Sequence, residues 1–294
     1  MTQTFTLESL NAVPAAAFAE AMGDIFEHAP WVAQAAAGRR PFETVTALHE
    51  AMTTSVRESP AERQLELIRA HPELGSRVKR IDITADSQAE QGGLGLDRLS
   101  EPEFTAFSRL NAAYAAKFGF PFIICVRRHT RDSILRQFER RLSNDAQSER
   151  KAALDEIGLI ARLRLSGKVE GPGKPKTDGR LSTHVLDNVS GKPARGVAVS
   201  LYEIGAHARG LLAQSVTNAD GRTDQPLISG EPLRIGTYEL QFHVRDYFAA
   251  NGTAQSEPSF LDIVPLRFSV AEPEGHYHVP LLVTPWSYST YRGS

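Results

Sequence analysis

The chain has 294 residues, 41% of them hydrophobic, so it can bury a large core and is long enough for two domains. Lys and Arg number 33 against 35 Asp and Glu, and a net charge of −2 excludes a general attraction to nucleic acid or an anionic membrane. The one cysteine, Cys125, excludes an internal disulfide framework and a Cys-rich zinc site. No run approaches the roughly 20 apolar residues of a membrane span, and the polar start lacks signal-peptide features. A cytoplasmic protein with a small-molecule substrate, and with no nucleic-acid or membrane partner, is expected.

Residues 7–166 carry a helical pattern with recognisable start signals. In "SPAE", Ser59 is expected as N-cap and Glu62 as the third helical residue, which together form a capping box. "SEPE" repeats the arrangement with Ser100 as the cap and Glu103 as the third residue. Further helices are expected around 14–27, 42–57, 132–143 and 146–165, about six in all, with "FGFPFIICV" as a non-helical apolar stretch.

The sequence pattern changes after a linker. "SGKVEGPGKPKTDGR" is rich in Gly, Pro and Lys and is expected to bury no apolar surface. After it, runs such as "GVAVSLYEI", "LLAQSVTN", "GTYELQFHV" and "DIVPLRFSV" alternate with period two, giving about seven strands and an antiparallel sandwich. "DYFAANG" is expected to hold a short helix. The predicted fold is multidomain, with an all-α domain at 1–167, a linker at 168–178 and an all-β domain at 179–294.

Three motifs of the helical half carry side chains suited to a binding site. Pro72 bars α geometry from the residue before it, so His71 is expected at a helix end, as a cap or with its ring in a cleft. In "DSQAEQ", Ser87 and Glu90 share one face if the segment is helical, although Ser-x-x-Glu also reads as a capping box. In "FPFI", proline leaves backbone groups of 120–123 free for a flat polar ligand.

In this order and spacing, "HPELGSR", "SxxEQ", "FGFPFIICVR" and "EIGLIARLRL" resemble the 2-oxo-4-hydroxy-4-carboxy-5-ureidoimidazoline (OHCU) decarboxylases of urate breakdown. The resemblance covers about residues 7–166 and implies an all-helical fold, no cofactor, and loss of CO2 from OHCU to give (S)-allantoin. By position it implies His71 and Glu90 as the catalytic pair. The implied substrate-binding residues are Pro72, Ser87, Gln91, the backbone of Phe120 and Ile123, and Arg164, with Arg162 as the alternative arginine.

Decarboxylation without a cofactor leaves the electron pair to the substrate's own ring carbonyl and imine. The protein then has to hold a planar ring, orient the carboxylate and deliver a proton to one face. A pair of His71 and Glu90 suits the proton transfer if the carboxylate fixes the imidazole tautomer and raises the imidazole pKa toward neutrality. Which of the two donates the proton stays open.

The β half carries a second group of candidates, each of which is by itself most often structural or solvated. His184 lies on a predicted strand, Arg222 follows a turn, and His276 and His278 share one strand face because side chains alternate. An H-x-H pair can hold zinc or copper, with His184 or His243 as a third ligand. A metal-dependent hydrolase is therefore one alternative, but no nearby Cys or carboxylate completes the set, and no metal is expected.

The motifs "LSTHVLDNVSGKPARGVAVSLYEI", "NADGRTDQPL", "GTYELQFHVRDYF" and "HYHVPLLVTPWSYSTYRGS" resemble the transthyretin-related 5-hydroxyisourate (HIU) hydrolases over residues 179–294. The hormone carriers of that superfamily lack the histidines, the arginine and the "YRGS" tail, which disfavours a binding-only role. A transthyretin-like small-molecule carrier is kept as the other alternative. The resemblance implies a homo-oligomer, a tetramer with sites at the dimer-dimer interface. The implied catalytic residues are His184, Arg222, His278 and Ser294, with Tyr291, Arg292 and Gly293 binding substrate and His276 less clearly involved.

Together the two resemblances predict a bifunctional enzyme that hydrolyses HIU to OHCU and decarboxylates OHCU to (S)-allantoin. Hydrolysis needs a base for water and positive charge for the developing oxyanion. His184 or His278 can be the base, and Arg222 with Arg292 can supply the charge. A nearby arginine also keeps a histidine neutral, which is the form that accepts a proton.

Overall fold

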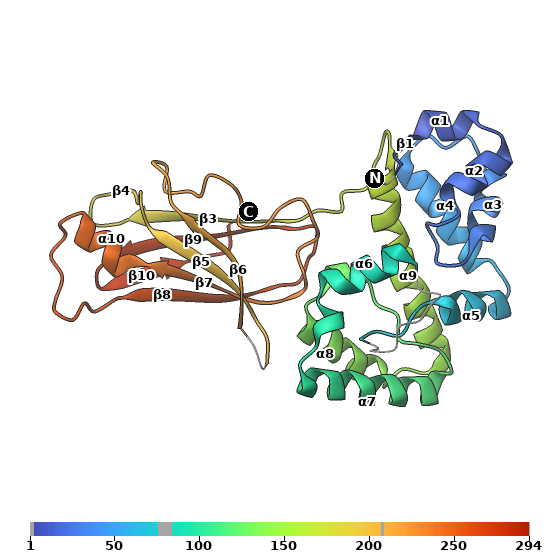
Figure 1. The fold of residues 1–294 in the computed structure, drawn as a ribbon. Helices are drawn as coiled ribbons and strands as arrows, with labels where there is room; N and C mark the ends of the chain where they lie inside the picture. The colour runs from blue at the N-terminus through green and yellow to red at the C-terminus, as the bar shows by residue number, and fades with distance from the viewer. Residues whose placement is uncertain (1–2, 76–83, 207–208, 294) are drawn as a thin grey trace. The chain divides into compact units, whose positions relative to one another are not determined.

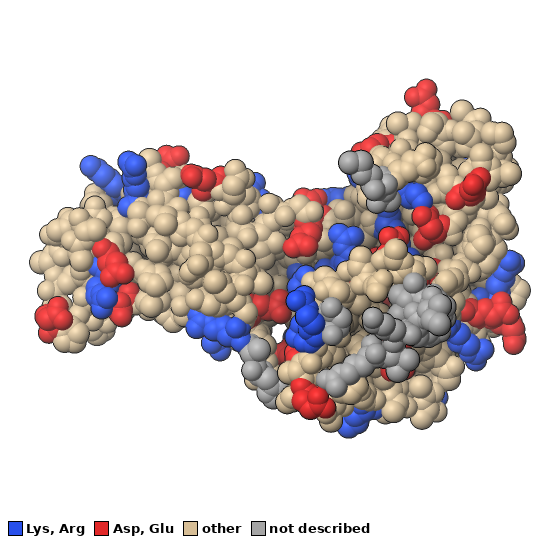
Figure 2. All heavy atoms as spheres, in the orientation of Figure 1, with Lys and Arg blue, Asp and Glu red and all other residues tan. Residues whose placement is uncertain are grey.

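The computed structural model describes residues 3–75, 84–206 and 209–293 (Figure 1). The chain divides into two compact units, one of Met1–Arg127 with Ile134–Thr177 and the other of Arg128–Ser133 with Asp178–Ser294. Acidic and basic side chains are interspersed on the face drawn in Figure 2. Among the described residues, no helix combines the length and apolar character that crossing a membrane requires.

Helices dominate the described part of the chain up to Lys168, and all six predicted helices are present. Of three further helices, the sequence leaves the one at 85–93 open, and the pattern missed the two short helices at 7–12 and 30–37. The second of these is the Ala-rich "PWVAQAAA", in which alanine gives little contrast between a buried and an exposed face. The nine α-helices are α1 Leu7–Ala12, α2 Ala15–Met22, α3 Pro30–Ala37, α4 Val45–Arg57, α5 Ala61–Ala70, α6 Ala85–Gly93, α7 Glu101–Phe118, α8 Arg131–Arg141 and α9 Ala146–Lys168.

The two predicted capping boxes have different outcomes. Ser100 caps α7 as expected, and the Glu103 carboxylate accepts the Ser100 backbone N–H at 2.8 Å. The cap expected at Ser59 is wrong, since α5 begins at Ala61 with no side-chain cap. The Ser59 hydroxyl instead donates to the Val56 carbonyl at the end of α4, at 2.8 Å. The hydroxyl of a serine between two helices can accept from the start of the second helix or donate to the end of the first, and here it donates to the first.

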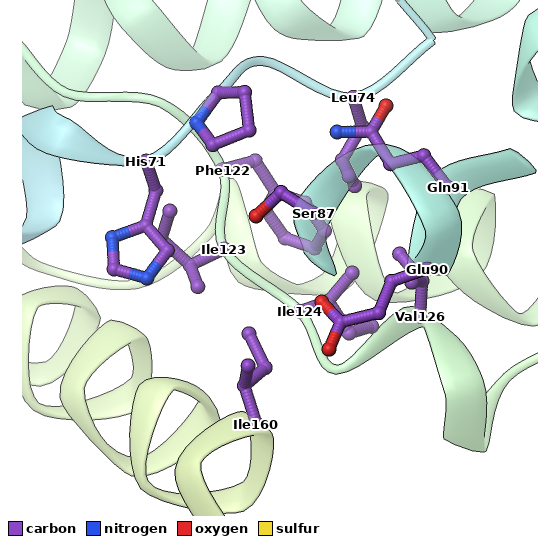
Figure 3. A pocket seen from close by; sticks show the side chains of 11 residues that line it. His71, Leu74, Ser87, Glu90, Gln91, Phe122, Ile123, Ile124, Val126 and Ile160 are labelled. Atoms are coloured by element: carbon purple, nitrogen blue, oxygen red, sulfur yellow. The ribbon is translucent and has the colours of Figure 1, made fainter. Parts of the chain in front are cut away.

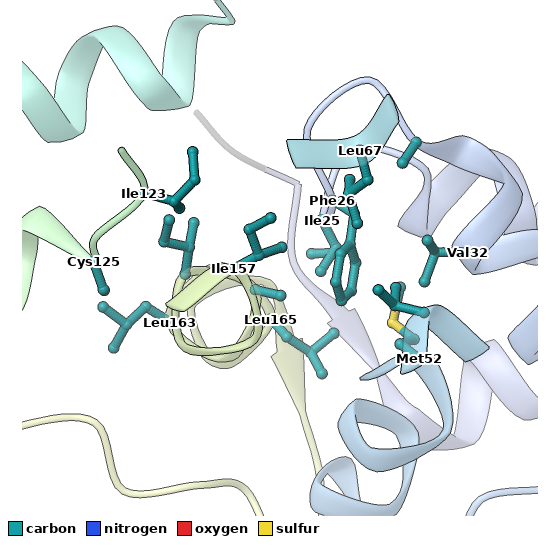
Figure 4. Close-up of a cluster of buried hydrophobic side chains, with 14 of the residues drawn as sticks. Ile25, Phe26, Val32, Met52, Leu67, Ile123, Cys125, Ile157, Leu163 and Leu165 are labelled. Carbon is teal, nitrogen blue, oxygen red and sulfur yellow. The ribbon is translucent and has the colours of Figure 1, made fainter. Parts of the chain in front are cut away.

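Helix α9 runs through the hydrophobic core of the helical unit. Figure 4 views this helix down its axis, with Ile123 and Cys125 on one side and Phe26, Leu67 and Met52 on the other. Because apolar side chains cover both sides of α9, any polar side chain that it carries inward has to find partners inside the protein.

The first residues of the predicted linker belong to the helical unit. Strand β2 (Val169–Glu170) pairs in parallel with β1 (Phe5–Thr6), and the Val169 side chain is fully buried. The expectation that this stretch buries no apolar surface is therefore wrong at Val169. The Pro172 carbonyl accepts the Val45 N–H at 2.9 Å, which satisfies one of the backbone donors at the start of α4.

The C-terminal unit contains two four-stranded sheets, in the orders β10-β9-β3-β4 and β6-β5-β7-β8. The predicted runs form strands, and "DYFAANG" contributes to the expected short helix, α10 (Val244–Ala250). Inward side chains of both sheets, such as Leu181 and Leu240, share one hydrophobic core. The strands are β3 Arg180–Asp187, β4 Lys192–Pro193, β5 Ala198–Ile204, β6 Arg209–Val216, β7 Gly236–His243, β8 Ile263–Val270, β9 His276–Thr284 and β10 Ser287–Thr290.

The expectation of an antiparallel arrangement is wrong at one strand pair. β3 and β9 pair in parallel, with Ser182 opposite His278, whereas the other strand pairs of the two sheets are antiparallel. Alternating side chains report which face of a strand is buried but not the direction of its neighbour. This parallel pair brings the histidines of the two strands together.

Candidate active sites

A small pocket in the helical unit forms where the end of α5, helix α6, the segment before the 3₁₀ turn at Val126–Arg128, and α9 meet (Figure 3). Six of its lining residues were expected from the sequence: His71, Pro72, Ser87, Glu90, Gln91 and Ile123. The others are apolar: Leu74, Phe122, Ile124, Val126 and Ile160. A few polar groups on an apolar wall suit a small planar ligand.

His71 ends α5 in an extended conformation, as Pro72 requires, and is buried. Its Nδ1 lies 2.9 Å from the Leu67 carbonyl, and because a carbonyl can only accept, Nδ1 carries the ring proton. The buried Nε2 has no hydrogen-bond partner among the described residues. Burial lowers the pKa of His71 to about 4. The ring is therefore neutral at pH 7, with Nε2 as a proton acceptor.

The expected coupling between His71 and Glu90 is wrong in two respects. The Leu67 carbonyl, rather than a carboxylate, sets the tautomer of His71. The pKa of the ring moves down instead of up, because burial outweighs the influence of nearby negative charge. Both carboxylate oxygens of Glu90 accept hydrogen bonds from Arg164 instead, each at 3.1 Å.

Helix α6 presents Ser87 and Glu90 to the pocket from one face. Its N-cap is Thr84, whose hydroxyl accepts the Ser87 backbone N–H at 3.3 Å. The interpretation of Ser87 as a capping residue is therefore wrong, and both Ser87 and Glu90 are helical residues of α6.

Arg164 projects from α9 and donates hydrogen bonds to three polar side chains of this site. Its Nη1 donates to Glu27 at 2.9 Å, and its Nη2 donates to the Ser87 hydroxyl at 3.1 Å as well as to Glu90. The Arg164 side chain is only 6% exposed and the Glu27 side chain is fully buried. Two carboxylates thus share one guanidinium inside the protein.

The structure separates the two arginines left open by the sequence. Arg164 contacts Ser87 and Glu90, although it does not itself line the pocket. Arg162 donates to the Lys176 carbonyl at 2.7 Å, on the exposed side of α9.

The segment 120–123 differs from its expected role in part. The Phe120 ring packs against Tyr114, with ring centroids 5.9 Å apart, and Phe120 does not line the pocket. Ile123 lines the pocket, but its carbonyl accepts from Arg141 Nη1 at 2.7 Å. That carbonyl is therefore not left unpaired for a ligand.

Sequence reasoning missed Glu27, which lies between α2 and α3. Burial acts to raise its pKa, but hydrogen bonds from Thr84, Arg164 and Ser87 outweigh it and lower the pKa below the ordinary value. The available signal was an acid that directly follows the apolar pair Ile25 and Phe26 in "DIFEHA", since a carboxylate buried among apolar residues needs a partner.

Replacing Arg164 with Met is expected to destabilise the helical unit by about 3–5 kcal/mol, because Glu27 and Glu90 lose their shared cation. Urea unfolding followed by circular dichroism measures the change. Arg162→Met is the matched control and should alter stability by less than about 0.5 kcal/mol. Equal losses from the two variants would contradict a buried role for Arg164.

In the β unit, His184 and His278 lie near each other on β3 and β9, with ring centroids 6.4 Å apart. Burial lowers the pKa of both rings, and the charge of Arg222 lowers it further. Arg222 pairs with His184 in an isolated backbone bridge. The expected effect of arginine on the histidines is therefore present, with burial as the larger cause.

Ser182 joins the two histidines of the H-x-H motif and was not expected from the sequence. Its hydroxyl lies 3.0 Å from His278 Nδ1 and 3.1 Å from His276 Nε2. Within the ranges that the structure describes, no three His, Cys, Asp or Glu side chains are grouped as metal ligands. His243, considered as a third ligand, lies on β7 in the other sheet.

The described end of the chain reaches the same place. The Gly293 N–H donates to the His278 carbonyl at 2.8 Å, and a Cβ at Gly293 would lie 2.7 Å from His278 Cδ2, so this approach requires glycine. The Arg292 guanidinium lies over the Tyr277 ring, 4.6 Å from its centroid, and Tyr291 is exposed. Ser294 lies outside the described residues.

Comparison with known proteins assigns the two parts of the chain. The OHCU decarboxylase model matches residues 11–166, and the HIUase/Transthyretin family model matches residues 181–293. The 5-hydroxyisourate hydrolase of Deinococcus radiodurans is 58% identical over 114 residues, which are 39% of this chain and 95% of that protein. The OHCU decarboxylase of Haloferax volcanii is 42% identical over 161 residues, which are 55% of this chain and 94% of that protein.

A solved structure is similar over nearly the whole length. The crystal structure of (S)-allantoin synthase matches 98% of this chain and 100% of that chain, with 36% identity and a TM-score of 0.52. The chain belongs to the OHCU decarboxylase family through its helical part and to the HIUase/transthyretin family through its β part.

Proposed function

We propose that this chain is a bifunctional enzyme of urate degradation. Its β unit hydrolyses HIU to OHCU, and its helical unit decarboxylates OHCU to (S)-allantoin. Membership of the two families and the full-length similarity to (S)-allantoin synthase support this function. The observation that carries the decarboxylase assignment is the neutral His71 in a pocket with Ser87 and Glu90.

The decarboxylation needs a proton acceptor that later donates. C4 of OHCU carries a carboxylate and a hydroxyl, and C5 carries the ureido group. Heterolysis of the bond between C4 and the carboxylate releases CO2 and moves its electron pair between C4 and C5, while the imine nitrogen takes one proton from solvent. His71 Nε2 takes the C4 hydroxyl proton and returns it to C5 on one face, leaving a carbonyl at C4.

The apolar wall of the pocket assists the same step. A carboxylate held against Ile124, Val126 and Ile160 is poorly solvated, and this unfavourable solvation ends when neutral CO2 forms. The polar groups of the pocket hold the ring while the charge moves into it.

Decarboxylase kcat/KM is expected to fall on the acid side with an apparent pKa near 4, rather than near the ordinary histidine value of 6.5. Nε2 has to be unprotonated, so activity is retained above this pKa and lost below it. Burial dominates the shift, the charge of Glu27 acts upward, and the charges of Arg164 and His28 act downward. Rates on OHCU generated in situ between pH 4 and 8 test this, and a midpoint near 6.5 would contradict it.

For HIU hydrolysis, we propose His278 as the base that deprotonates water. In the proposed tautomer its Nδ1–H donates to Ser182 and the Ser182 hydroxyl donates to His276, which leaves His278 Nε2 as the acceptor. Arg222 supplies positive charge beside the two rings. Tyr291, Arg292 and Gly293 remain proposed substrate-binding residues, and Ser294 remains a proposed catalytic residue.

Ser182→Ala is expected to lower kcat/KM for HIU about tenfold, which corresponds to the loss of one orienting hydrogen bond of about 1.4 kcal/mol. Stopped-flow absorbance of HIU measures the rate. Ser200→Ala, which removes a buried serine of β5, is the control and should leave the rate unchanged. Unchanged hydrolysis in Ser182→Ala would remove Ser182 from the site.

The function as a whole is tested by mixing the protein with freshly generated HIU. Loss of near-ultraviolet absorbance reports hydrolysis, and circular dichroism reports (S)-allantoin. An unchanged decay of HIU would leave a transthyretin-like carrier as the better function for the β unit. Hydrolysis followed by racemic allantoin would contradict the decarboxylase.

We also propose a cytoplasmic homo-oligomer, a tetramer formed through the β unit. Rings at the edge strand β10 and its surroundings are exposed in the single chain, with Trp286 at 60%, Tyr288 at 46% and Tyr291 at 58%. Exposed aromatic side chains that lie together mark association surfaces. Cys125 is buried and takes part in no disulfide, which suits a reducing compartment. Sedimentation equilibrium would reveal a monomer if the assembly is wrong.

A further inference from the structure

We infer that Glu27 is a positioning residue for the decarboxylation and acts through Ser87, an inference that rests on the proposed function of the helical unit. The Ser87 hydroxyl donates to Glu27 Oε2 at 3.0 Å, and Arg164 Nη2 donates to the Ser87 oxygen at 3.1 Å. A hydroxyl has one proton, and this one is directed to Glu27. Toward the pocket, Ser87 therefore offers only a lone pair.

Glu27 is held so that its carboxylate can only accept. The Thr84 hydroxyl donates to Oε1 at 2.6 Å, and Arg164 Nη1 donates to Oε2 at 2.9 Å. The side chain is fully buried, and its pKa is lowered by these donors, so it is ionised at neutral pH. Three donors, from the N-cap of α6, from α6 itself and from α9, fix the carboxylate in one position.

This arrangement makes Ser87 and Glu90 hydrogen-bond acceptors toward the pocket. The Glu90 carboxylate is engaged with Arg164 and also offers acceptors, three residues along the same helix. Figure 3 shows the oxygens of Ser87 and Glu90 in the pocket together with the His71 ring. Neighbouring acceptors match the N–H groups of a ureido or cyclic urea edge, and they disfavour a ligand with a carbonyl at that place.

Glu27→Gln is the first test. Its neutral amide oxygen accepts the Ser87 proton less strongly than a carboxylate does, so the Ser87 proton can turn toward the pocket and meet a substrate N–H. Decarboxylase kcat/KM is expected to fall at least about tenfold, chiefly through a higher KM, because binding of the N–H edge is lost. Glu27→Asp keeps the negative charge, so its loss of kcat/KM should be smaller than that of Glu27→Gln. HIU hydrolysis by the same protein is the internal reference and should not change.

Asp24→Asn is the matched control for loss of an ionic link between the segment after α2 and helix α9. Asp24 lies in the same segment as Glu27 and pairs with Lys168, also on α9, so it ties the same two elements together away from Ser87. Its substitution should leave both kcat and KM at the values of the unmodified protein. A tenfold loss in Asp24→Asn would show that the tether, and not the polarity of Ser87, governs the activity.

A double-mutant cycle decides whether Glu27 acts through Ser87. In a Ser87→Ala background, Glu27→Gln is expected to change kcat/KM by less than about twofold, because the hydroxyl through which Glu27 acts is gone. Losses that multiply independently, or full activity in Glu27→Gln alone, would overturn the inference. If Glu27→Gln does not fold, as judged by thermal melting, the same cycle is run with Glu27→Asp. An unmodified protein that does not decarboxylate OHCU would overturn the proposed function itself, and this inference with it.

Discussion

His71→Ala is expected to slow OHCU decarboxylation by about 10²- to 10⁴-fold, the range of a general acid-base residue. The variant removes the neutral Nε2, which is the buried acceptor in the pocket. HIU hydrolysis by the same protein should stay at its original rate, because its residues belong to the other unit. Consumption of OHCU and the enantiomeric purity of allantoin are measured together, since uncatalysed decay gives no preference for one enantiomer.

His49→Gln is the matched control for His71→Ala. His49 is a half-buried histidine of the helical unit, its pKa is also lowered by burial, and its Nε2 lies 2.8 Å from the Gly158 carbonyl. It does not line the pocket, so decarboxylation should persist in this variant. Loss of activity in both variants would mean that replacing either histidine disturbs the folding of the helical unit, and the catalytic role of His71 would be contradicted.

His278→Ala is expected to give the reverse pattern. HIU hydrolysis should drop by about 10²- to 10⁴-fold, since the proposed base and its link to Ser182 are removed. OHCU supplied by a separate hydrolase should still be decarboxylated at the original rate. Absorbance of HIU follows the first step and circular dichroism follows the second.

His243→Ala serves as the control in the β unit, because His243 belongs to the other sheet. It should leave HIU hydrolysis intact. Equal damage to hydrolysis and decarboxylation from His278→Ala would contradict the assignment of one reaction to each unit. Activity that survives in His278→Ala would transfer the base to His184.

The helical half shows which parts of a fold a single sequence predicts. Long periodic segments and the Ser100 cap were predictable, because spacing and capping are local properties. The Ser59 cap failed because two helices compete for one hydroxyl. The prediction that the linker buries no apolar surface failed at Val169, because its partner strand β1 lies at the other end of the helical half in sequence.

In the β half, the positions of the strands were predictable but their pairing was not. Alternation located the strands but did not specify that β3 and β9 run in parallel. Ser182 was invisible for the same reason. A serine on a strand becomes part of a site only when the neighbouring strand places His276 and His278 beside it.

The sequence by itself determined the two families' motifs, the change from helical to alternating periodicity, and the position of His71 at a helix end, which Pro72 imposes locally. The tertiary structure decided how these residues are charged and oriented. Glu27 reaches Ser87 across 60 residues of chain, and Arg164 reaches Glu90 across 74. Burial, which depends on the whole core, makes His71 a neutral acceptor with a pKa near 4. Protonation and hydrogen-bond direction depend on neighbours in space, and local sequence does not contain those neighbours.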